Sequence, residues 1–193
     1  MPLILASASQ IRRTMLEQAG IAHVAIAADI DEPAIKAGHD DPARATVALA
    51  GAKALAVSAQ NPGAWVIGSD SMVTVDARSF DKPASREEAA DHLRFFSGKP
   101  MTLTSAVALA RDGAVDWAEA DRAALAVRAL SEKFIQSYLD AEWPGVGHCV
   151  GVFRLEGPGV QLFESIDGDH FTVLGMPLLP LLGALRMRGL VPS

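Results

Sequence analysis

The opening of the chain constrains its fold most, because an apolar run is followed by an amphipathic segment and then by a second apolar run. Residues 3–6 predict a strand, residues 10–19 a helix closed by Gly20, and residues 22–27 another strand. Two strands separated by a helix in this way are typical of an α/β fold.

The rest of the chain continues to alternate between strand and helix patterns. Asp41 and Pro42 predict the start of a helix to about residue 60, as N-cap and first helical residue. The buried-strand run 65–67 ends at Gly68-Ser69-Asp70, so Asp70 is expected where a strand changes course. The other expected elements are a strand at 71–76 (a continuation or a partner), strands at 101–110, 115–128, 149–155 and 160–166, and helices from 85 to 96, over 131–141 and over 178–188. Ser85 and Glu88 form a capping box at the start of the first of these helices, and Ser131 opens the second.

Together these patterns predict a single α/β domain over residues 1–193, with a mixed sheet flanked by helices. Connections of both hairpin and crossover type occur, so the sheet is not expected to be purely parallel. The sequence contains no repeat, long linker or step in composition that would mark a domain boundary.

Composition excludes several classes of function. With 193 residues, a net charge of -6 and half its residues hydrophobic, the chain suits one compact core and lacks the basic balance of a nucleic-acid binder. The one cysteine, Cys149, fits a reducing compartment and offers no metal-ligand spacing. The apolar run 171–185 contains two prolines and is shorter than the roughly eighteen residues of a membrane span. We therefore expect a cytoplasmic protein without a membrane partner.

The loop after the first strand has the composition of a phosphate-binding turn. Ser7, Ala8 and Ser9 precede the helix, and Arg12 and Arg13 lie one turn into it. A helix N-terminus offers unpaired N–H groups and favours negative charge, while arginines add fixed positive charge. The alternative is that Ser9 only caps the helix and the arginines are solvated.

Further acidic and basic residues suit phosphoryl chemistry. Glu32 follows two aspartates in "ADIDEP", Lys53 lies on the long helix, Asp70 follows a buried strand, and Lys82 precedes a proline. Lysines bind phosphate oxygens, and carboxylates hold a hard cation such as Mg²⁺ against phosphate. Structural roles remain open for each. Lys53 lies at the edge of the expected apolar stripe of that helix (Val47, Ala50, Ala54 and Val57), Lys82 lies in a turn, and Asp70 is a buried, paired carboxylate.

Other enzyme chemistry would use other residues of the chain. Asp29 and Asp31 after an apolar strand resemble the nucleophile motif of aspartyl-phosphate phosphatases, but Glu32-Pro33 follows where those enzymes have Thr or Val. The five histidines show no metal spacing, and Cys149 has only His148 as an activating neighbour. The phosphatase is kept as an alternative.

The motifs as a set resemble the Maf family of nucleotide pyrophosphatases. The resemblance covers nearly the whole chain through "LASASQIRR", "DIDE", "GAKA", "GSDSMV", "DKP", "FFSGK" and "EGPGVQLFESIDGDHFTVLGMPLLPLL", in the family's order and spacing. It implies a Maf/ITPase-like mixed sheet with a central nucleotide cleft, and hydrolysis of nucleoside triphosphates to monophosphate and pyrophosphate with Mg²⁺ or Mn²⁺. By analogy alone it also suggests a homodimer.

The resemblance assigns roles to residues. Asp70 matches the catalytic proton acceptor, and Glu32 with Asp70 the acidic positions near the metal. Ser7, Arg12, Lys53 and Lys82 match phosphate-binding positions, with Arg13 as a helper.

Within the family the chain looks most like the branch that acts on 7-methylguanosine triphosphate. Glu156 matches a specificity position, where a carboxylate would accept hydrogen bonds from a guanine. Ile11 stands where relatives carry Trp or Arg, and Ser71 where they carry Gln, so substrate preference is expected to be shifted or broad. The implied role is house-cleaning, which keeps non-standard nucleotides from being incorporated. The non-enzymatic alternative is a nucleotide-binding regulator of cell division or septum formation.

Overall fold

The computed structural model of the protein describes residues 3–192. Two compact units can be distinguished, the first made of residues up to Ser71, Thr104–Asp121 and the chain from His170 on, the second of Met72–Leu103 and Arg122–Asp169. Three long strands, β3 (Trp65–Val75), β5 (Pro100–Arg111) and β6 (Ala114–Val127), contribute residues to both units. The prediction of one domain over residues 1–193 stays a prediction.

The sheet is mixed, as the sequence predicts. Strand order is β2-β1-β3-β5-β6-β7, with β4 paired to β3. The pairs β1–β2 and β1–β3 are parallel, whereas β3–β4 and β6–β7 are antiparallel. The strands are β1 (Leu3–Leu5), β2 (Val24–Ala25), β3 (Trp65–Val75), β4 (Arg78–Phe80), β5 (Pro100–Arg111), β6 (Ala114–Val127) and β7 (Phe163–Asp167).

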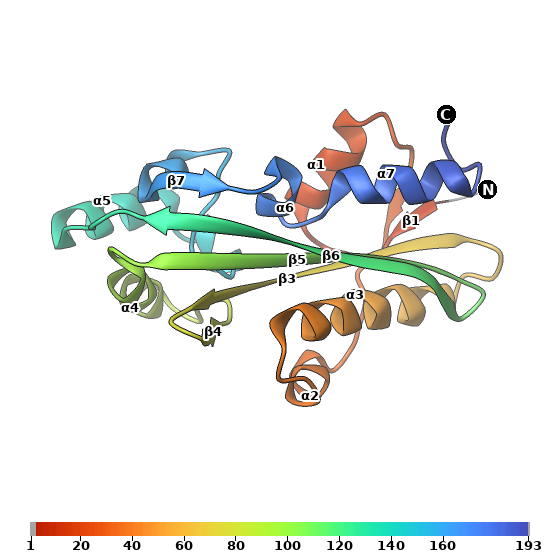
Figure 1. Ribbon diagram of the computed structural model, residues 1–193, viewed down its shortest axis with the longest axis horizontal. Helices are drawn as coiled ribbons and strands as arrows, with labels where there is room; N and C mark the ends of the chain where they lie inside the picture. The colour runs from red at the N-terminus through yellow and green to blue at the C-terminus, as the bar shows by residue number, and fades with distance from the viewer. Residues whose placement is uncertain (1–2, 193) are drawn as a thin grey trace. The chain divides into compact units, whose positions relative to one another are not determined.

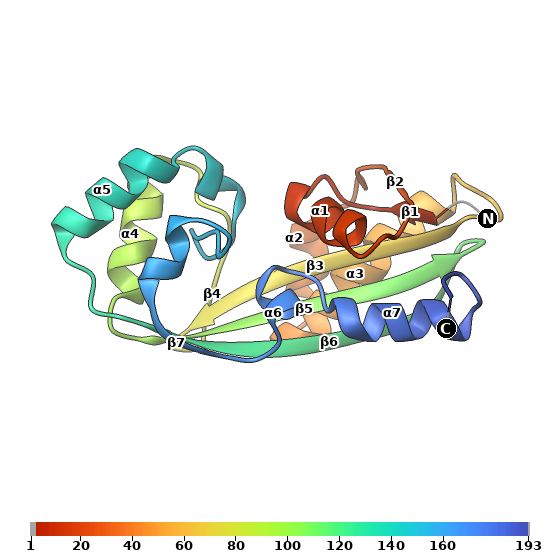
Figure 2. The same ribbon diagram turned by 90° about the horizontal axis from the view of Figure 1, so that it is seen from above.

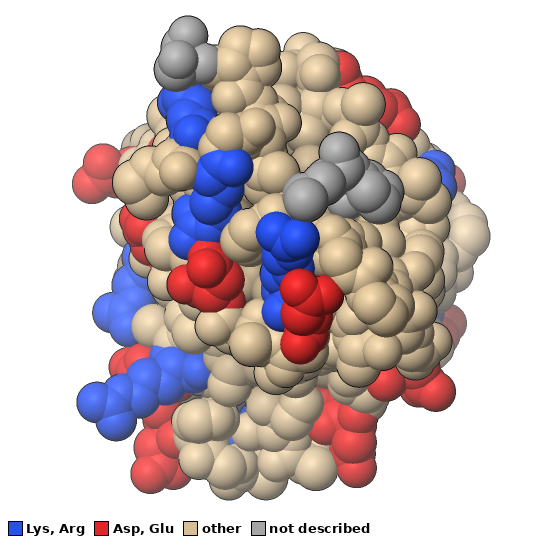
Figure 3. Space-filling model, turned by 90° about the vertical axis from the view of Figure 1, so that its right-hand side faces the viewer, with Lys and Arg blue, Asp and Glu red and all other residues tan. Residues whose placement is uncertain are grey.

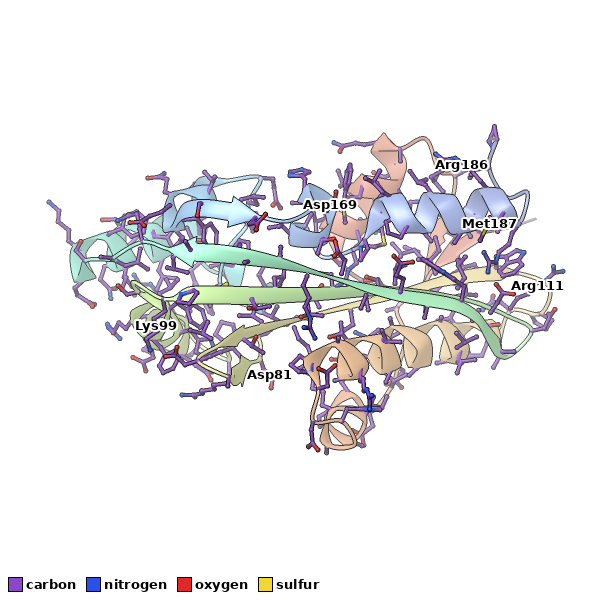
Figure 4. The ribbon with its side chains drawn as sticks, viewed as in Figure 1. Asp81, Lys99, Arg111, Asp169, Arg186 and Met187 are labelled. Carbon is purple, nitrogen blue, oxygen red and sulfur yellow. The ribbon has the colours of Figure 1, made fainter. Side chains whose placement is uncertain are left out.

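In the first unit, helices cover both faces of the strands. Figure 1 shows α3 (Pro42–Ser58) below them and α1 (Gln10–Gln18) and α7 (Leu178–Met187) above. Side chains alternate across β3, so Trp65 and Ile67 pack with α1 and α7 while Val66 packs with α3. On the outer side of α7, Arg186 and Met187 point away from the strands (Figure 4), and Met187 is 78% exposed. This unit is thus an α/β/α sandwich.

The long helix α3 follows the sequence prediction closely. Asp41 Oδ1 accepts a hydrogen bond from Arg44 N–H at 2.9 Å, and Pro42 is the first helical residue. Ala50, Ala54 and Val57 are buried in one core cluster, and Val47 packs against its edge. The expected apolar stripe is therefore confirmed.

The second unit contains two helices, α4 (Arg86–Phe96) and α5 (Glu132–Glu142), which lie side by side (Figure 2). Ser85 caps α4 by accepting a hydrogen bond from Glu88 N–H at 3.1 Å, as the capping box predicts. Two short 3-10 helices, η1 (Gly145–His148) and η2 (Pro158–Leu162), lie between α5 and β7.

Three sequence expectations are wrong. Asp70 does not mark a change of course, because β3 runs without a break from Trp65 to Val75. No strand forms at 149–155, where the hydroxyl of Tyr138 donates to Val152 O at 3.0 Å and so takes a carbonyl that a strand ladder would use. Of the strand expected at 160–166, the first residues belong to η2 and only the rest to β7.

Three short elements were not predicted at all: α2 (Glu32–Ala37), α6 (His170–Val173) and β4. The helix α2 begins where Asp31 Oδ1 accepts a hydrogen bond from Ala34 N–H at 3.0 Å. The sequence did contain that cap, but six residues carry too little periodicity to reveal a helix.

No helix in the described part of the chain is both long and apolar enough to cross a membrane. On the face drawn in Figure 3, basic and acidic side chains lie next to one another among uncharged residues. That face carries no extended patch of one sign.

Candidate active site

Asp70 lies on the face of β3 that packs against α3, and it is only 7% exposed. The helix approaches the strand closely at Gly68, where an added Cβ would lie 2.0 Å from Ala50 O and 2.7 Å from Ala54 N. Because glycine lets the backbone of α3 approach this closely, Lys53 on the same helix reaches Asp70.

Lys53 joins two carboxylates. Its Nζ lies 2.6 Å from Asp70 Oδ1 and 2.8 Å from Glu32 Oε1, and the Lys53 and Asp70 side chains are about nine-tenths buried. Within residues 3–192, Asp70 Oδ2 makes no hydrogen bond or ion pair. The structure therefore brings three of the predicted residues together and leaves one carboxylate oxygen of Asp70 able to take a ligand or a proton.

The donor set at Lys53 fits a hard divalent cation in part. One carboxylate oxygen each of Glu32 and Asp70 lies within 2.8 Å of Lys53 Nζ, and oxygen donors are what Mg²⁺ and Mn²⁺ prefer. Across the described residues no group of three or more His, Cys, Asp or Glu side chains is placed to hold a metal. Mg²⁺ is commonly held by one or two carboxylates plus substrate phosphates, which is the kind of site these two residues can form.

The predicted phosphate-binding turn follows β1. In the parallel register Leu3 and Leu5 pair with Trp65 and Ile67, which directs the end of β1 toward the Asp70 segment of β3. Ser7 Oγ accepts a hydrogen bond from Ser9 N–H at 3.2 Å. Ser9 itself makes no side-chain cap to α1, which contradicts the simple capping interpretation. The first turn of α1 thus keeps N–H groups that no side chain caps.

The two arginines of α1 differ in their surroundings. Arg13 donates through Nη2 to Gln10 Oε1, and its buried Nε has no hydrogen-bond partner within the described chain. Arg12 donates to Ser69 O, Ser71 Oγ and Gly175 O at 2.9–3.0 Å. Burial lowers the pKa of the Arg12 guanidinium, and the negative charges of Asp70 and Glu32 oppose that shift. Arg12 is thus bound to the protein itself, on the face of β3 opposite Lys53.

Two of the predicted specificity positions, Ile11 and Ser71, lie in the first unit. Ile11 is half-buried on α1. Ser71 is also half-buried, and its hydroxyl bonds Gly175 O at 3.0 Å and lies 2.9 Å from Ser105 Oγ. The sequence did not indicate the partners Ser69, Ser105, Thr172 or Gly175, although hydroxyl residues on both sides of Asp70 were a visible signal.

The second unit carries the remaining two candidates, each described within that unit. Lys82 is exposed two residues after the end of β4 and follows exposed Asp81 in the chain (Asp81 is labelled in Figure 4). Glu156 is exposed at the tip of a turn closed by a 3.2 Å hydrogen bond from Gly157 N–H to Arg154 O. Arg154 is anchored in turn to buried Glu142, with Nη2 2.7 Å from Oε2.

Three residues of the alternative chemistries, Cys149, Asp31 and His92, lie in positions that fit a structural role. Burial, followed by the charge of Glu156, raises the pKa of the Cys149 thiol, which disfavours a nucleophilic thiolate. Asp31, one of the two aspartates of the phosphatase alternative, caps α2. His92 is buried among aromatic rings.

The sequence matches a known protein family over most of its length. Residues 2–188 match the family described as Maf-like protein. This chain belongs to the Maf family. The Maf resemblance inferred from the motifs is thereby confirmed.

Curated members of the Maf family match the chain over almost its whole length. The nucleoside triphosphate pyrophosphatase of Bradyrhizobium diazoefficiens is 46% identical over 98% of this chain and 95% of its own length. The protein of that name from Paramagnetospirillum magneticum is 47% identical, with 98% and 100% covered. The 7-methyl-GTP pyrophosphatase of Rhizobium etli is 46% identical, with 98% and 97% covered. These Maf relatives are similar to this chain over the segments that carry both Asp70 and Glu156.

Proposed function

We propose that this Maf-family protein is a nucleoside triphosphate pyrophosphatase, a hydrolase that cleaves its substrate to a monophosphate and pyrophosphate. The observation that carries the proposal is Asp70, a buried carboxylate whose Oδ1 is held at 2.6 Å by Lys53 while Oδ2 stays open. The names of relatives at 46–47% identity support it.

In this mechanism Asp70 is the general base. Lys53 fixes the carboxylate through Oδ1, and Oδ2 accepts a proton from the water that attacks the α-phosphorus in line with the departing pyrophosphate. As a basic side chain, Lys53 also favours negative charge on the phosphates around it. No covalent enzyme intermediate is needed.

The phosphates are bound by the remaining basic groups. The uncapped N-terminus of α1, with Ser7 and Arg13, supplies N–H and hydroxyl donors for phosphate oxygens. Lys82, in the second unit, matches a phosphate-binding position by the family resemblance. Glu32 and Asp70 would hold a divalent cation such as Mg²⁺ or Mn²⁺, which would supply positive charge to offset that of the leaving pyrophosphate.

The favoured substrate is 7-methylguanosine triphosphate. Glu156 presents its carboxylate at an exposed turn, where it accepts hydrogen bonds from the N1–H and N2 amino group of guanine. The name of the Rhizobium etli relative supports this preference. Ile11 offers no aromatic face for a cationic methylated base, so we propose that other purine triphosphates are also used.

Product analysis tests the function. Wild-type protein with Mg²⁺ or Mn²⁺ is incubated with canonical and modified triphosphates, and pyrophosphate is measured separately from orthophosphate. We expect pyrophosphate and a monophosphate, with 7-methylguanosine triphosphate the best substrate. Orthophosphate alone would favour a phosphatase that uses Asp29 or Asp31, and binding without turnover would favour a regulator.

The Asp70→Asn variant tests the role of the base. The amide keeps the shape of the carboxylate but accepts no proton, so turnover should fall by about 10²–10⁴-fold while nucleotide binding is kept. Calorimetric titration with a non-hydrolysable triphosphate measures the binding. Full turnover by the variant would refute the role of Asp70.

A further inference from the structure

A network of hydrogen bonds lies on the face of β3 opposite Asp70. Ser69 and Ser71 flank Asp70 in the strand, so their side chains point away from Lys53 and toward α1 and α7. The Ser71 hydroxyl lies 3.0 Å from Gly175 O, and the Ser69 hydroxyl donates to Ala106 O at 2.8 Å and lies 3.2 Å from Gly175 O. Residues on either side of Asp70 are thus tied to one carbonyl group.

Arg12 connects the parts of this network. Its Nε donates to Gly175 O at 2.9 Å, Nη1 to Ser69 O at 2.9 Å, and Nη2 to Ser71 Oγ at 3.0 Å. Three of its five N–H groups therefore bind the segment that carries Asp70, in the fixed planar geometry of a guanidinium group.

Each serine hydroxyl can donate only one proton, and this fixes which groups donate and which accept in the network. Ser105 uses its single proton to bond Thr172 O at 2.8 Å. The proton of Ser71 is then shared between Gly175 O and Ser105 Oγ, while Ser71 accepts from Arg12. If Ser71 lost its hydroxyl, Arg12 Nη2 would lose its hydrogen-bond acceptor.

The Gly175 segment is itself fixed in place. Gly175 has φ of +103°, and an added Cβ would lie 3.2 Å from Ser71 Oγ and 3.6 Å from Arg12 Nη2. Three positions earlier in the chain, the buried Thr172 donates its hydroxyl to Asp121 Oδ2 at 2.7 Å, and its carbonyl oxygen accepts the bond from Ser105. The carbonyl on which Arg12 and the serines converge is therefore held from both sides of the turn.

From this geometry we infer that Arg12 is a positioning residue for Asp70 rather than a ligand of the substrate phosphates. The inference rests on the proposed function, in which Asp70 is the base. Arg12 fixes the backbone at Ser69 and the side chain of Ser71, and so sets where the carboxylate of Asp70 lies relative to the attacking water. Only two of the Arg12 N–H groups remain for a phosphate, unless the guanidinium turns away from Gly175 O and Ser69 O.

Arg12→Lys tests the inference, since lysine keeps the charge but loses the planar fork. We expect kcat to fall by roughly 10–100-fold, as catalytic groups misplaced by about 1 Å do, while the Kd of an α,β-methylene triphosphate changes by less than about threefold. Ser71→Ala should lower kcat by a smaller factor. The double variant should lose little more than Arg12→Lys alone, because both changes break the same network.

A matched control is available in the same unit. Arg188 donates its Nε to Asp116 Oδ2 and its Nη1 to Ala184 O, a comparable fork outside the proposed site. Arg188→Lys should leave kcat unchanged. Thermal melting checks each variant for folding, and Ser71→Ala with Ser69→Ala replaces Arg12→Lys in the comparison if the lysine variant does not fold.

A more than tenfold weaker Kd for the analogue in Arg12→Lys, with kcat preserved, would overturn the inference in favour of a phosphate contact. Fully multiplicative effects of Arg12→Lys and Ser71→Ala on kcat would overturn it as well. If wild-type protein itself releases no pyrophosphate from any triphosphate, the proposed function fails before Arg12 is tested, so the two failures are distinguishable.

Discussion

At the scale of single residues, Lys53 carries the charge balance of the candidate site. One ammonium group lies between the carboxylates of Asp70 and Glu32, at 2.6 and 2.8 Å. Water reaches little of the Lys53–Asp70 pair, since both side chains are about nine-tenths buried. Loss of the lysine would therefore leave two close negative charges without a counterion.

Lys53→Met should lower the free energy of unfolding by about 3 kcal/mol, the usual cost of breaking a buried ion pair from one side. Turnover should fall as well, because Asp70 loses the group that holds Oδ1. Urea denaturation measures the stability. Lys133→Met, at an exposed lysine of α5, is the control and should change it by less than about 0.5 kcal/mol. Equal stability of the two variants would mean that solvent already screens the Lys53 pair.

The sequence predicted the chemistry of the site better than its geometry. Residue types at Glu32, Lys53 and Asp70 pointed to one cluster, and the structure brings these three together. The role of Arg12 depends on Gly175, which lies 163 positions further along the chain. Contacts of that separation are set by packing of α1 and α7 on one face of β3, and no local pattern encodes them.

At the scale of elements, the contact between α3 and β3 depends on Gly68. A methyl group at Gly68 would meet Ala50 O at 2.0 Å, so Gly68→Ala must push α3 away from β3. We expect a loss of about 3 kcal/mol or more in the free energy of unfolding, and lower turnover because Lys53 moves with α3.

Gly51→Ala provides the contrast on α3 itself. The added Cβ lies 3.6 Å from Val115 Cγ2, an ordinary contact, and alanine favours the helix. The free energy of unfolding of Gly51→Ala should be about 0.5–1 kcal/mol higher than that of the wild-type protein. Denaturation curves of both variants test the pair, and a tolerated Gly68→Ala would show that α3 does not pack directly on the strand.

Helices were predicted best where the sequence contains a visible N-terminal cap. The helices α3, α4 and α5 begin at Asp41, Ser85 and Ser131, whose side chains each accept the cap hydrogen bond that the sequence implied. The segment between α5 and β7 was misassigned because its apolar residues, including Val146, Val152 and Phe153, are buried without a strand ladder. Apolar character alone does not distinguish these two ways of being buried.

At the scale of the molecule, the chain passes between its two compact units four times. Three of these crossings, at Ser71–Met72, Leu103–Thr104 and Asp121–Arg122, fall inside β3, β5 and β6. A strand cannot lose its residues in one unit without disturbing the ladder that continues in the other. Unfolding should therefore be one cooperative transition.

The pH dependence of unfolding should reveal that His92, in the second unit, is buried. The ring is 8% exposed, meets Phe80 edge to face at 5.1 Å, and has a buried Nδ1 without a hydrogen-bond partner in the described chain. Burial lowers its pKa, against the opposing charges of Glu88, Asp91 and Asp81 and together with the repulsion of Arg78.

A His pKa that is lower in the folded than in the unfolded state makes protonation favour unfolding. This stability is complete above the unfolded pKa of about 6.5 and is lost as pH falls through and below that value. Between pH 7 and pH 5 the Tm of wild-type protein should drop by roughly 2–4 °C more than that of His92→Leu, which cannot titrate. Differential scanning calorimetry at matched ionic strength measures both. Parallel Tm curves would mean that His92 is protonated as readily in the folded protein as in the unfolded chain, and that the aromatic cluster around it admits water.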